Sequence, residues 1–289
     1  MAGFRDRVPG VVDLRVVPYP AVTVVVDLGG GVVVDDGSGR RQRGSVVAGL
    51  APGSVRAWGR EIECLQIRLS PVVAHAVLGA STELGGTVVG LDDLWGGDAT
   101  RTQEQLHTAK SWDDRFALIE AALAGRYEAG RAVDPEVAFA WEQMVVSGGR
   151  MRVERLAGEL GWSRKRLWSR FRAQIGLTPK RAAQLVRFDH AAHRLAAGHS
   201  AARVAAEGGY VDQSHLHRDV MAFAGVTPTA VAVAPWLAVD DIAWAAPKPH
   251  PPPDQGRLHP AQRHNGGRPR GEHSSKTSAS RARDTASHA

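Results

Sequence analysis

The feature that most constrains this chain is a pattern that occurs twice between residues 150 and 233. The stretch LAGELGWS at 156–163 reappears as VAAEGGYVD at 204–212, and the segment 163–179 reappears as 212–228. The offset between the copies is 48 residues at first and 49 after one inserted residue near Val211. Each copy contains a short apolar helix, a Gly turn, a Ser or Asp N-cap, a second helix and a Gly-x-Thr-Pro exit. This order is that of a helix-turn-helix unit, so the sequence predicts two such units.

The second helix of the first copy separates an apolar face from a basic face. If Ser163 is the N-cap, Leu167 and Phe171 lie four residues apart on one face and pack inward. The opposite face carries Lys165, Ser169 and Arg172, flanked by Arg166 and Trp168. A basic face on a short, anchored helix suits the major groove of DNA, where side chains near the helix N-terminus reach base edges.

The second copy has the same division into faces. Leu216 and Val220 are expected to face inward, and Val220 is smaller than the Phe of the first copy, which predicts looser packing in this unit. The residues expected to face outward are Ser214, His217, Arg218 and Met221. Between the copies, Thr178 is a predicted N-cap and Pro179 begins a linker helix that runs to about residue 197. One copy alone would be compatible with a basic, solvated helix in an ordinary all-helical domain, but two aligned copies argue against that interpretation.

Charge is distributed unevenly along the 289 residues, whose net charge is +6. Residues 1–149 hold 14 basic and 19 acidic side chains, whereas residues 150–233 hold 14 basic and 6 acidic ones. Residues 247–289 carry a further net charge of +5. A basic block behind an acidic front half predicts that one part of the chain meets a polyanion and the other does not.

In residues 1–149 the sequence pattern predicts strands followed by helices. Val-rich runs separated by Pro, Gly and Asp predict strands at 11–17, 22–28, 31–36, 45–50 and 61–69. The DLGGG sequence at 27–31 is predicted to be a hairpin turn, because the Lys and Ser/Thr of a phosphate-binding loop are missing. Helices are predicted to follow Ser70, Ser111 and Asp134, each of which is a suitable N-cap.

The predicted fold class is therefore α+β, with an N-terminal β-rich domain and an all-α C-terminal one. We expect a sensory or oligomerisation domain at 1–98, a helical connector and dimerisation region at 99–149, and the two helix-turn-helix units at 150–233. The last segment, 234–289, is predicted to be an extension that is disordered from about residue 247. That part has seven prolines and a single large apolar residue, Leu258, so it cannot bury a core.

Several classes of site and location are disfavoured. Cys64 is the only cysteine, which excludes a disulfide within the chain and a thiolate metal site. The pair His190 and His193, and the pair His215 and His217, would need carboxylate or cysteine ligands that the sequence pattern does not place with them, so no metal or cofactor is predicted. No run resembles a signal peptide or a membrane span, so a cytoplasmic location and no membrane partner are expected.

Residues 150–233 resemble the DNA-binding domain of the AraC/XylS family of bacterial transcription regulators. The resemblance is carried by LAGELGWSRKRLWSRFRAQIGLTPKRAAQLVRFDHAAHRLAAG and by VAAEGGYVDQSHLHRDVMAFAGVTP. Within the second stretch, GYVDQSHLHR is similar to the family's Gly-Phe-x-Asp/Ser-Gln-Ser-x-Phe-x-Arg, although the family has Phe where Leu216 and Val220 stand. The resemblance implies two helix-turn-helix units, joined by a linker helix, that read adjacent major-groove segments.

The same resemblance implies which side chains meet DNA. Base edges would be contacted by Lys165, Trp168 and Ser169 in the first unit and by Gln213, Ser214 and Arg218 in the second, with Arg172 and His217 beside them. Phosphate contacts are expected from Arg164, Arg166, Arg170, Lys180 and Arg181.

The sequence thus predicts a sequence-specific transcription regulator that binds double-stranded DNA and is not an enzyme. A small-molecule effector of the N-terminal domain, RNA polymerase and a second copy of the chain are further expected partners. Two alternatives are a non-specific, nucleoid-like DNA binder and a DNA-repair enzyme fused to an AraC-like module. The two predicted reading helices disfavour the first alternative, and the single cysteine, Cys64, disfavours the second because it cannot supply a thiolate zinc site.

Overall fold

A computed structural model of the chain describes residues 1–5, 12–36, 39–50, 53, 55–60, 62–79 and 83–233. All of them belong to one compact unit, which spans Met1–Pro253. The predicted disordered extension at 234–289 lies outside the described residues.

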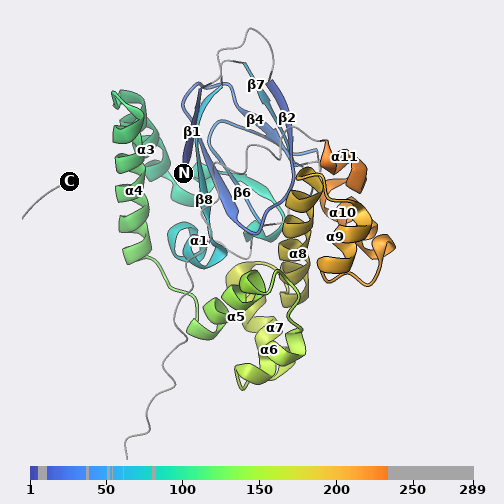
Figure 1. The fold of residues 1–289 in the computed structure, drawn as a ribbon. Helices are drawn as coiled ribbons and strands as arrows, with labels where there is room; N and C mark the ends of the chain where they lie inside the picture. The colour runs from blue at the N-terminus through green and yellow to red at the C-terminus, as the bar shows by residue number, and fades with distance from the viewer. Residues whose placement is uncertain are drawn as a thin grey trace, which may run out of the picture. The chain divides into compact units, whose positions relative to one another are not determined.

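The N-terminal part contains two antiparallel sheets (Figure 1). The five-stranded sheet has the order β1-β8-β3-β6-β9 and consists of β1 (Ala2–Arg5), β8 (Glu63–Leu69), β3 (Val22–Asp27), β6 (Val46–Ala48) and β9 (Val88–Gly90). The four-stranded sheet has the order β2-β7-β4-β5 and consists of β2 (Val12–Val16), β7 (Val55–Gly59), β4 (Val33–Asp35) and β5 (Arg41–Arg43). A cluster of apolar side chains from both sheets, including Val34, Val46, Val55 and Val88, forms a core of its own.

All five predicted strands are present, but the predicted hairpin turn at 27–31 is wrong. The segment links β3 to β4, and these strands belong to different sheets. Asp27 holds the link together, because its carboxylate accepts hydrogen bonds from the backbone N–H groups of Gly29, Gly30 and Val32 at 3.0–3.3 Å. The alternating pattern on either side of a turn does not reveal whether the chain returns to the same sheet.

Five α-helices follow β8 before the repeat region. They are α1 (Pro71–Leu78), α2 (Leu91–Trp95), α3 (Gly97–Thr108), α4 (Trp112–Ala129) and α5 (Pro135–Val146), and a short 3₁₀ turn, η1 (Glu83–Gly85), follows α1. The predicted N-caps of α1 and α4 are confirmed, since the Ser70 and Ser111 hydroxyls accept from backbone N–H groups three residues on. The polar helices α2 and α3 were not predicted, and α3 begins before the predicted domain boundary at 98.

The repeat region folds into the two predicted helix-turn-helix units, the first yellow-green and the second orange in Figure 1. The first unit comprises α6 (Val153–Glu159) and α7 (Arg164–Ile175), and the second comprises α9 (Ala201–Glu207) and α10 (Gln213–Ala224). The linker helix α8 (Pro179–Ala196) lies between them in the sequence, and α11 (Pro228–Ala232) follows the second unit. The predicted bounds of the linker helix are correct to within one residue.

Buried aromatic rings anchor both units, which differs from the expectation for the second one. Phe171 is fully buried in the first unit, and Val220 is equally buried at the corresponding place in the second. The second unit has an aromatic anchor one turn further along α10, where the Phe223 ring stacks on Phe188 of α8 with centroids 5.0 Å apart. The alignment of the two copies compares only equivalent positions. It therefore did not reveal that the buried ring of Phe223 supplies the packing that the small Val220 lacks.

Candidate nucleic-acid interface

The first reading helix, α7, is fixed by its cap and by its apolar face. The Ser163 hydroxyl accepts from the Arg166 backbone N–H at 3.2 Å, as predicted for an N-cap. Gly161 in the preceding turn has a φ of 64°, a left-handed conformation that costs Gly less than any other residue. Leu167 and Phe171 are completely buried, so the opposite face of the helix is held towards solvent.

The solvent face of α7 presents the side chains that the resemblance assigns to bases. Lys165, Ser169 and Arg172 are exposed, and Trp168 is 46% exposed. The Arg172 guanidinium carbon lies 5.2 Å from the centroid of the Trp168 ring, a distance at which a cation and an aromatic face attract each other. Arg172 and Trp168 therefore form one surface that is both cationic and apolar.

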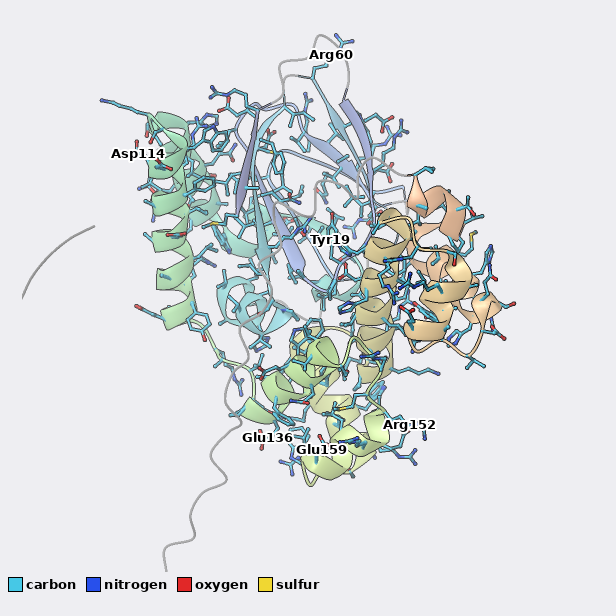
Figure 2. The ribbon with its side chains drawn as sticks, in the orientation of Figure 1. Tyr19, Arg60, Asp114, Glu136, Arg152 and Glu159 are labelled. Carbon is cyan, nitrogen blue, oxygen red and sulfur yellow. The ribbon has the colours of Figure 1, made fainter. Side chains whose placement is uncertain are left out.

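The predicted phosphate-contact arginines of α7 have different environments. Arg164 is exposed and lies 3.7 Å from the carboxylate of Glu154 on α6, the helix that follows Arg152 and ends at Glu159, both of which are labelled in Figure 2. Arg166 lies over the Trp162 ring, with its guanidinium carbon 4.4 Å from the ring centroid. Both guanidiniums stay at the surface, where a phosphate can replace or share these weak contacts.

Arg170 is bound to a residue of the preceding region. Its guanidinium forms an ion pair with Asp134 at 2.6 Å. Asp134 was predicted to cap α5 with its side chain, but no such cap forms, and its backbone N–H donates to the Gln174 side chain of α7 at 2.7 Å. Burial raises the pKa of the Asp134 carboxyl, but hydrogen bonds to Gln174 and Arg170 and the charges of Arg170 and Arg131 together lower it below its ordinary value. Arg170 thus serves to hold α7 against α5.

Arg181 is partly buried, and its environment favours packing over a phosphate contact. Its guanidinium carbon lies 3.7 Å from the centroid of the buried Phe223 ring. Burial lowers the pKa of Arg181, although the nearby Asp219 carboxylate raises it. Lys180, the other predicted phosphate contact on α8, is exposed.

The second reading helix, α10, is capped and exposed in the same way as the first. The Asp212 carboxylate accepts from the His215 backbone N–H at 2.7 Å. The predicted DNA-contacting side chains Gln213, Ser214, His217 and Arg218 are all exposed. Arg218 Nε donates to the Ser214 carbonyl at 3.3 Å, so the guanidinium lies along the helix surface.

A buried ion pair, which the sequence did not predict, joins α10 to the linker helix. Arg187 Nη2 of α8 donates to the Asp219 carboxylate at 3.1 Å, and the two side chains are only 15% and 9% exposed. The Arg187 guanidinium also lies 4.9 Å from the Tyr210 ring, and burial raises the pKa of the Tyr210 hydroxyl. The sequence did indicate that Asp219 is buried, because its helical spacing places it between Leu216 and Phe223 on the inward face of α10.

The described residues offer little support for other kinds of site. They include no cluster of His, Cys, Asp or Glu that could hold a metal ion. Cys64 is buried, and burial raises the pKa of its thiol to about 12, so the reactive thiolate is scarce at neutral pH. No helix in the described part of the chain is long and apolar enough to cross a membrane.

A match to a known protein family agrees with the assignment of the repeat region. Residues 156–232 match a family of helix-turn-helix domains, whereas no curated protein matches the chain. A solved structure of ToxT from Vibrio cholerae is 12% identical, with a TM-score of 0.46 over 80% of this chain and 96% of that one. ToxT from strain SCE256 of Vibrio cholerae with a bound unsaturated fatty acid is 13% identical, with a TM-score of 0.46 over 80% and 95%. The AraC-like transcriptional activator CuxR is 14% identical, with a TM-score of 0.26 over 73% and 83%.

The family match begins within α6 and covers the rest of both helix-turn-helix units and the linker helix between them. The same stretch holds the two capped, outward-facing reading helices and the AraC/XylS-like motif GYVDQSHLHR. Residues 156–232 therefore form a helix-turn-helix domain, and its motif resembles that of the AraC/XylS regulators.

Proposed function

We propose that the protein recognises a specific DNA sequence by placing α7 and α10 in adjacent segments of the major groove. The observation that carries this proposal is that both helices are anchored by buried apolar side chains and present polar side chains on the opposite face. In this arrangement Lys165, Trp168 and Ser169 read one segment, and Gln213, Ser214 and Arg218 read the other. Arg172 and His217 flank these sets, and Arg164, Arg166 and Lys180 contact phosphates.

We expect Lys165→Ala and Ser169→Ala to change the preferred DNA sequence without unfolding the protein, because both side chains are exposed. Loss of a base contact costs about 1–3 kcal/mol at its own base pair and little on unrelated DNA. The measurement is a binding titration on a selected site, on the same site with single base-pair changes, and on scrambled DNA. Equal losses on all of these DNAs would reassign both side chains to phosphate contacts.

The same titrations address the alternative of a non-specific, nucleoid-like binder. Binding that depends only on phosphates falls steeply with salt and does not distinguish sequences. A selected site is expected to bind at least about 10³-fold more tightly than scrambled DNA at the same salt concentration.

We further propose that the N-terminal part controls DNA reading in response to a small molecule. The contacts that support this lie at the end of α7, where Arg170 and Gln174 bind Asp134. A second close approach joins the η1 turn to the C-cap of α7: a Cβ atom on Gly85 would lie 2.1 Å from the Gly176 carbonyl oxygen. A change in the N-terminal part thus has a direct route to the first reading helix. Two further partners remain predicted: RNA polymerase, and a second copy of the chain bound through the connector at 99–149.

We expect Gly85→Ala to loosen the end of α7, because the added methyl group clashes with the backbone of Gly176. Such overpacking costs about 1–3 kcal/mol. Amides in the last turn of α7 should exchange hydrogen faster in this variant, whereas amides of α10 should not. Gly125→Ala is the control, since no atom lies within 4 Å of a Cβ added there. Unchanged exchange at α7 in Gly85→Ala would contradict the proposed route.

A further inference from the structure

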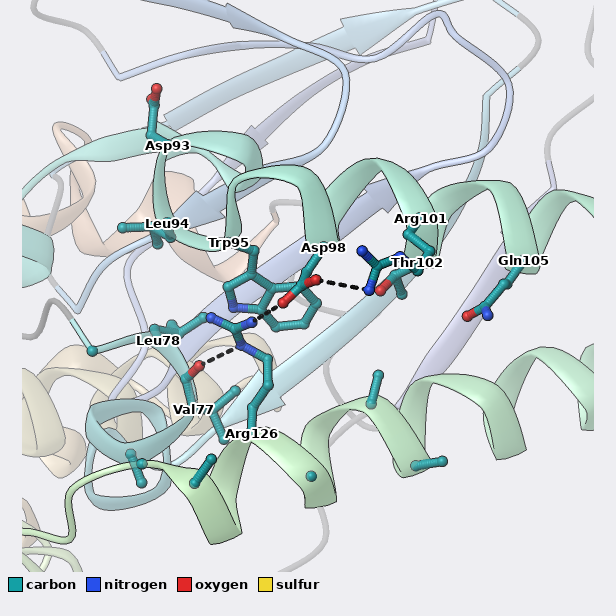
Figure 3. A pocket seen from close by; sticks show the side chains of 17 residues that line it. Val77, Leu78, Asp93, Leu94, Trp95, Asp98, Arg101, Thr102, Gln105 and Arg126 are labelled. Atoms are coloured by element: carbon teal, nitrogen blue, oxygen red, sulfur yellow. Dashed lines mark hydrogen bonds and ion pairs between the residues drawn. The ribbon is translucent and has the colours of Figure 1, made fainter.

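Two polar clusters outside the reading faces tie separate elements of the fold together. The first lies in the groove between α3 and α4, where Arg126 donates to the Val77 carbonyl of α1 and to Asp98 of α3, each at 3.1 Å (Figure 3). This cluster holds three helices of the N-terminal part together. The second cluster lies at the start of the second reading helix, α10, and is centred on His215.

His215 closes the turn in front of α10. The backbone N–H of Val211 donates to Nδ1 of the His215 imidazole at 3.4 Å. The Asp212 carboxylate in turn accepts from the His215 backbone N–H at 2.7 Å. The arrangement resembles a capping box, in which two side chains at the start of a helix satisfy two backbone N–H groups, but the imidazole reaches one residue further back than the usual Glu or Gln.

The same hydrogen bond defines which nitrogen of the His215 ring is protonated. A backbone N–H can only donate, so Nδ1 is the unprotonated nitrogen and the proton of the neutral ring lies on Nε2. Nε2 lies 4.0 Å from the Asp219 carboxylate. The imidazole also meets the Tyr210 ring in a T-shaped contact, with the ring centroids 5.3 Å apart. The His215 ring is therefore held between the turn and the buried ion pair of Asp219 with Arg187.

The first helix-turn-helix unit has no acceptor at the corresponding position. At the offset of 49 residues Arg166 takes the place of His215, and its guanidinium lies over the Trp162 ring. A guanidinium only donates, so it cannot accept from the turn in front of α7. The turn of the second unit is also one residue longer, at Val211, whose side chain is 88% exposed. The second unit thus contains both the additional backbone N–H and the side chain that accepts from it.

We propose that His215 is a positioning residue of the second reading helix, whose neutral imidazole fixes the turn at Val211. The fixed turn holds Gln213 and Ser214 in the orientation in which they reach base edges. His215 itself is not among the side chains assigned to DNA, and it is only 27% exposed. The effect on DNA rests on the function proposed above, whereas the contact with Val211 is measured on the free protein.

Two substitutions separate the acceptor from the ring. His215→Phe keeps an aromatic ring beside Tyr210 but has no acceptor, whereas His215→Asn has no ring but places its Oδ1 near the position of the imidazole Nδ1. His, Phe and Asn have similar helix propensities, so neither substitution changes the intrinsic stability of α10 much.

The first measurement is hydrogen exchange at the Val211 amide of the full chain without DNA. We expect exchange to be about two- to tenfold faster in His215→Phe, the factor that corresponds to the net loss of one hydrogen bond. In His215→Asn the rate should stay within about twofold of the wild type, because the acceptor is kept. Amides of α7 are the internal control and should not change in either variant.

The second measurement is base-resolution interference footprinting on a selected DNA site. We expect His215→Phe to weaken discrimination at the base pairs contacted by Gln213 and Ser214 by about two- to tenfold. The segment read by α7 should be unchanged, and His215→Asn should restore discrimination in the second segment.

Unchanged exchange at Val211 in His215→Phe would overturn the proposal. A His215→Asn variant that behaves like His215→Phe would also overturn it, because the ring and not its acceptor would then fix the turn. Faster exchange at Val211 with unchanged discrimination in the second segment would limit His215 to the stability of the turn and refute its role in reading. A wild-type chain that protects a single DNA segment would instead refute the proposed function, whatever the exchange at Val211.

Discussion

Asp219→Ala is expected to destabilise the second helix-turn-helix unit by about 3–5 kcal/mol, because it leaves the guanidinium of Arg187 buried without its partner. The loss of stability should be confined to the second unit. Hydrogen exchange at the amides of α10 should accelerate by a factor of about 10² or more, while the amides of α7 should change little. DNA binding should then lose the contribution of the second reading helix.

The double variant Arg187→Met/Asp219→Leu is the control for this interpretation. Replacing both partners of a buried ion pair by apolar side chains of similar volume is often neutral or stabilising. We therefore expect most of the protection of α10 to return in the double variant. If Asp219→Ala leaves the exchange of α10 unchanged, the ion pair does not hold this helix. If the double variant is as unstable as the single one, the loss stems from packing and not from the unpaired charge.

Phe171→Ala is expected to cost about 3–5 kcal/mol, because it removes a completely buried ring from the core of the first unit. Trp168→Ala on the same helix serves as the control, since Trp168 is 46% exposed and its loss should cost about 0.5 kcal/mol or less. Urea unfolding monitored by hydrogen exchange at α6 and α7 measures both. Similar losses of unfolding free energy in the two variants would show that the inward and outward faces of α7 are assigned incorrectly.

Val220→Ala removes a smaller side chain and should cost about 2 kcal/mol or less. Phe223→Ala is expected to have a larger effect than Val220→Ala, because the Phe223 ring also stacks on Phe188 of the linker helix. The order of these two losses tests whether Phe223 is the anchor of the second unit.

Features that depend on local sequence were predictable. The capping residues Ser163, Thr178 and Asp212 each sit where a side-chain oxygen can accept from the first turn of a helix. Together with the spacing of apolar residues they define α7, α8 and α10 without tertiary information. The exposed positions of the reading helices follow from the same periodicity.

Features that depend on contacts distant in sequence were not predictable in this way. The sequence around Asp134 is typical of an N-cap, yet its carboxylate binds Arg170, which lies 36 residues away. Arg181 lies over the ring of Phe223, and Asp219 pairs with Arg187 of another helix. The division of β3 and β4 between two sheets likewise depends on the pairing of strands that are far apart in the chain.

The central claim is that α7 and α10 read two separate segments of one DNA site. The most direct measurement is base-resolution interference footprinting of the wild-type chain, Lys165→Ala and Gln213→Ala on a site selected from genomic fragments. We expect two protected major-groove segments about one helical turn, ~10 base pairs, apart. Lys165→Ala should remove base-specific contacts in one segment only, and Gln213→Ala in the other only. A single protected segment, or the same loss of contacts in both variants, would contradict the account.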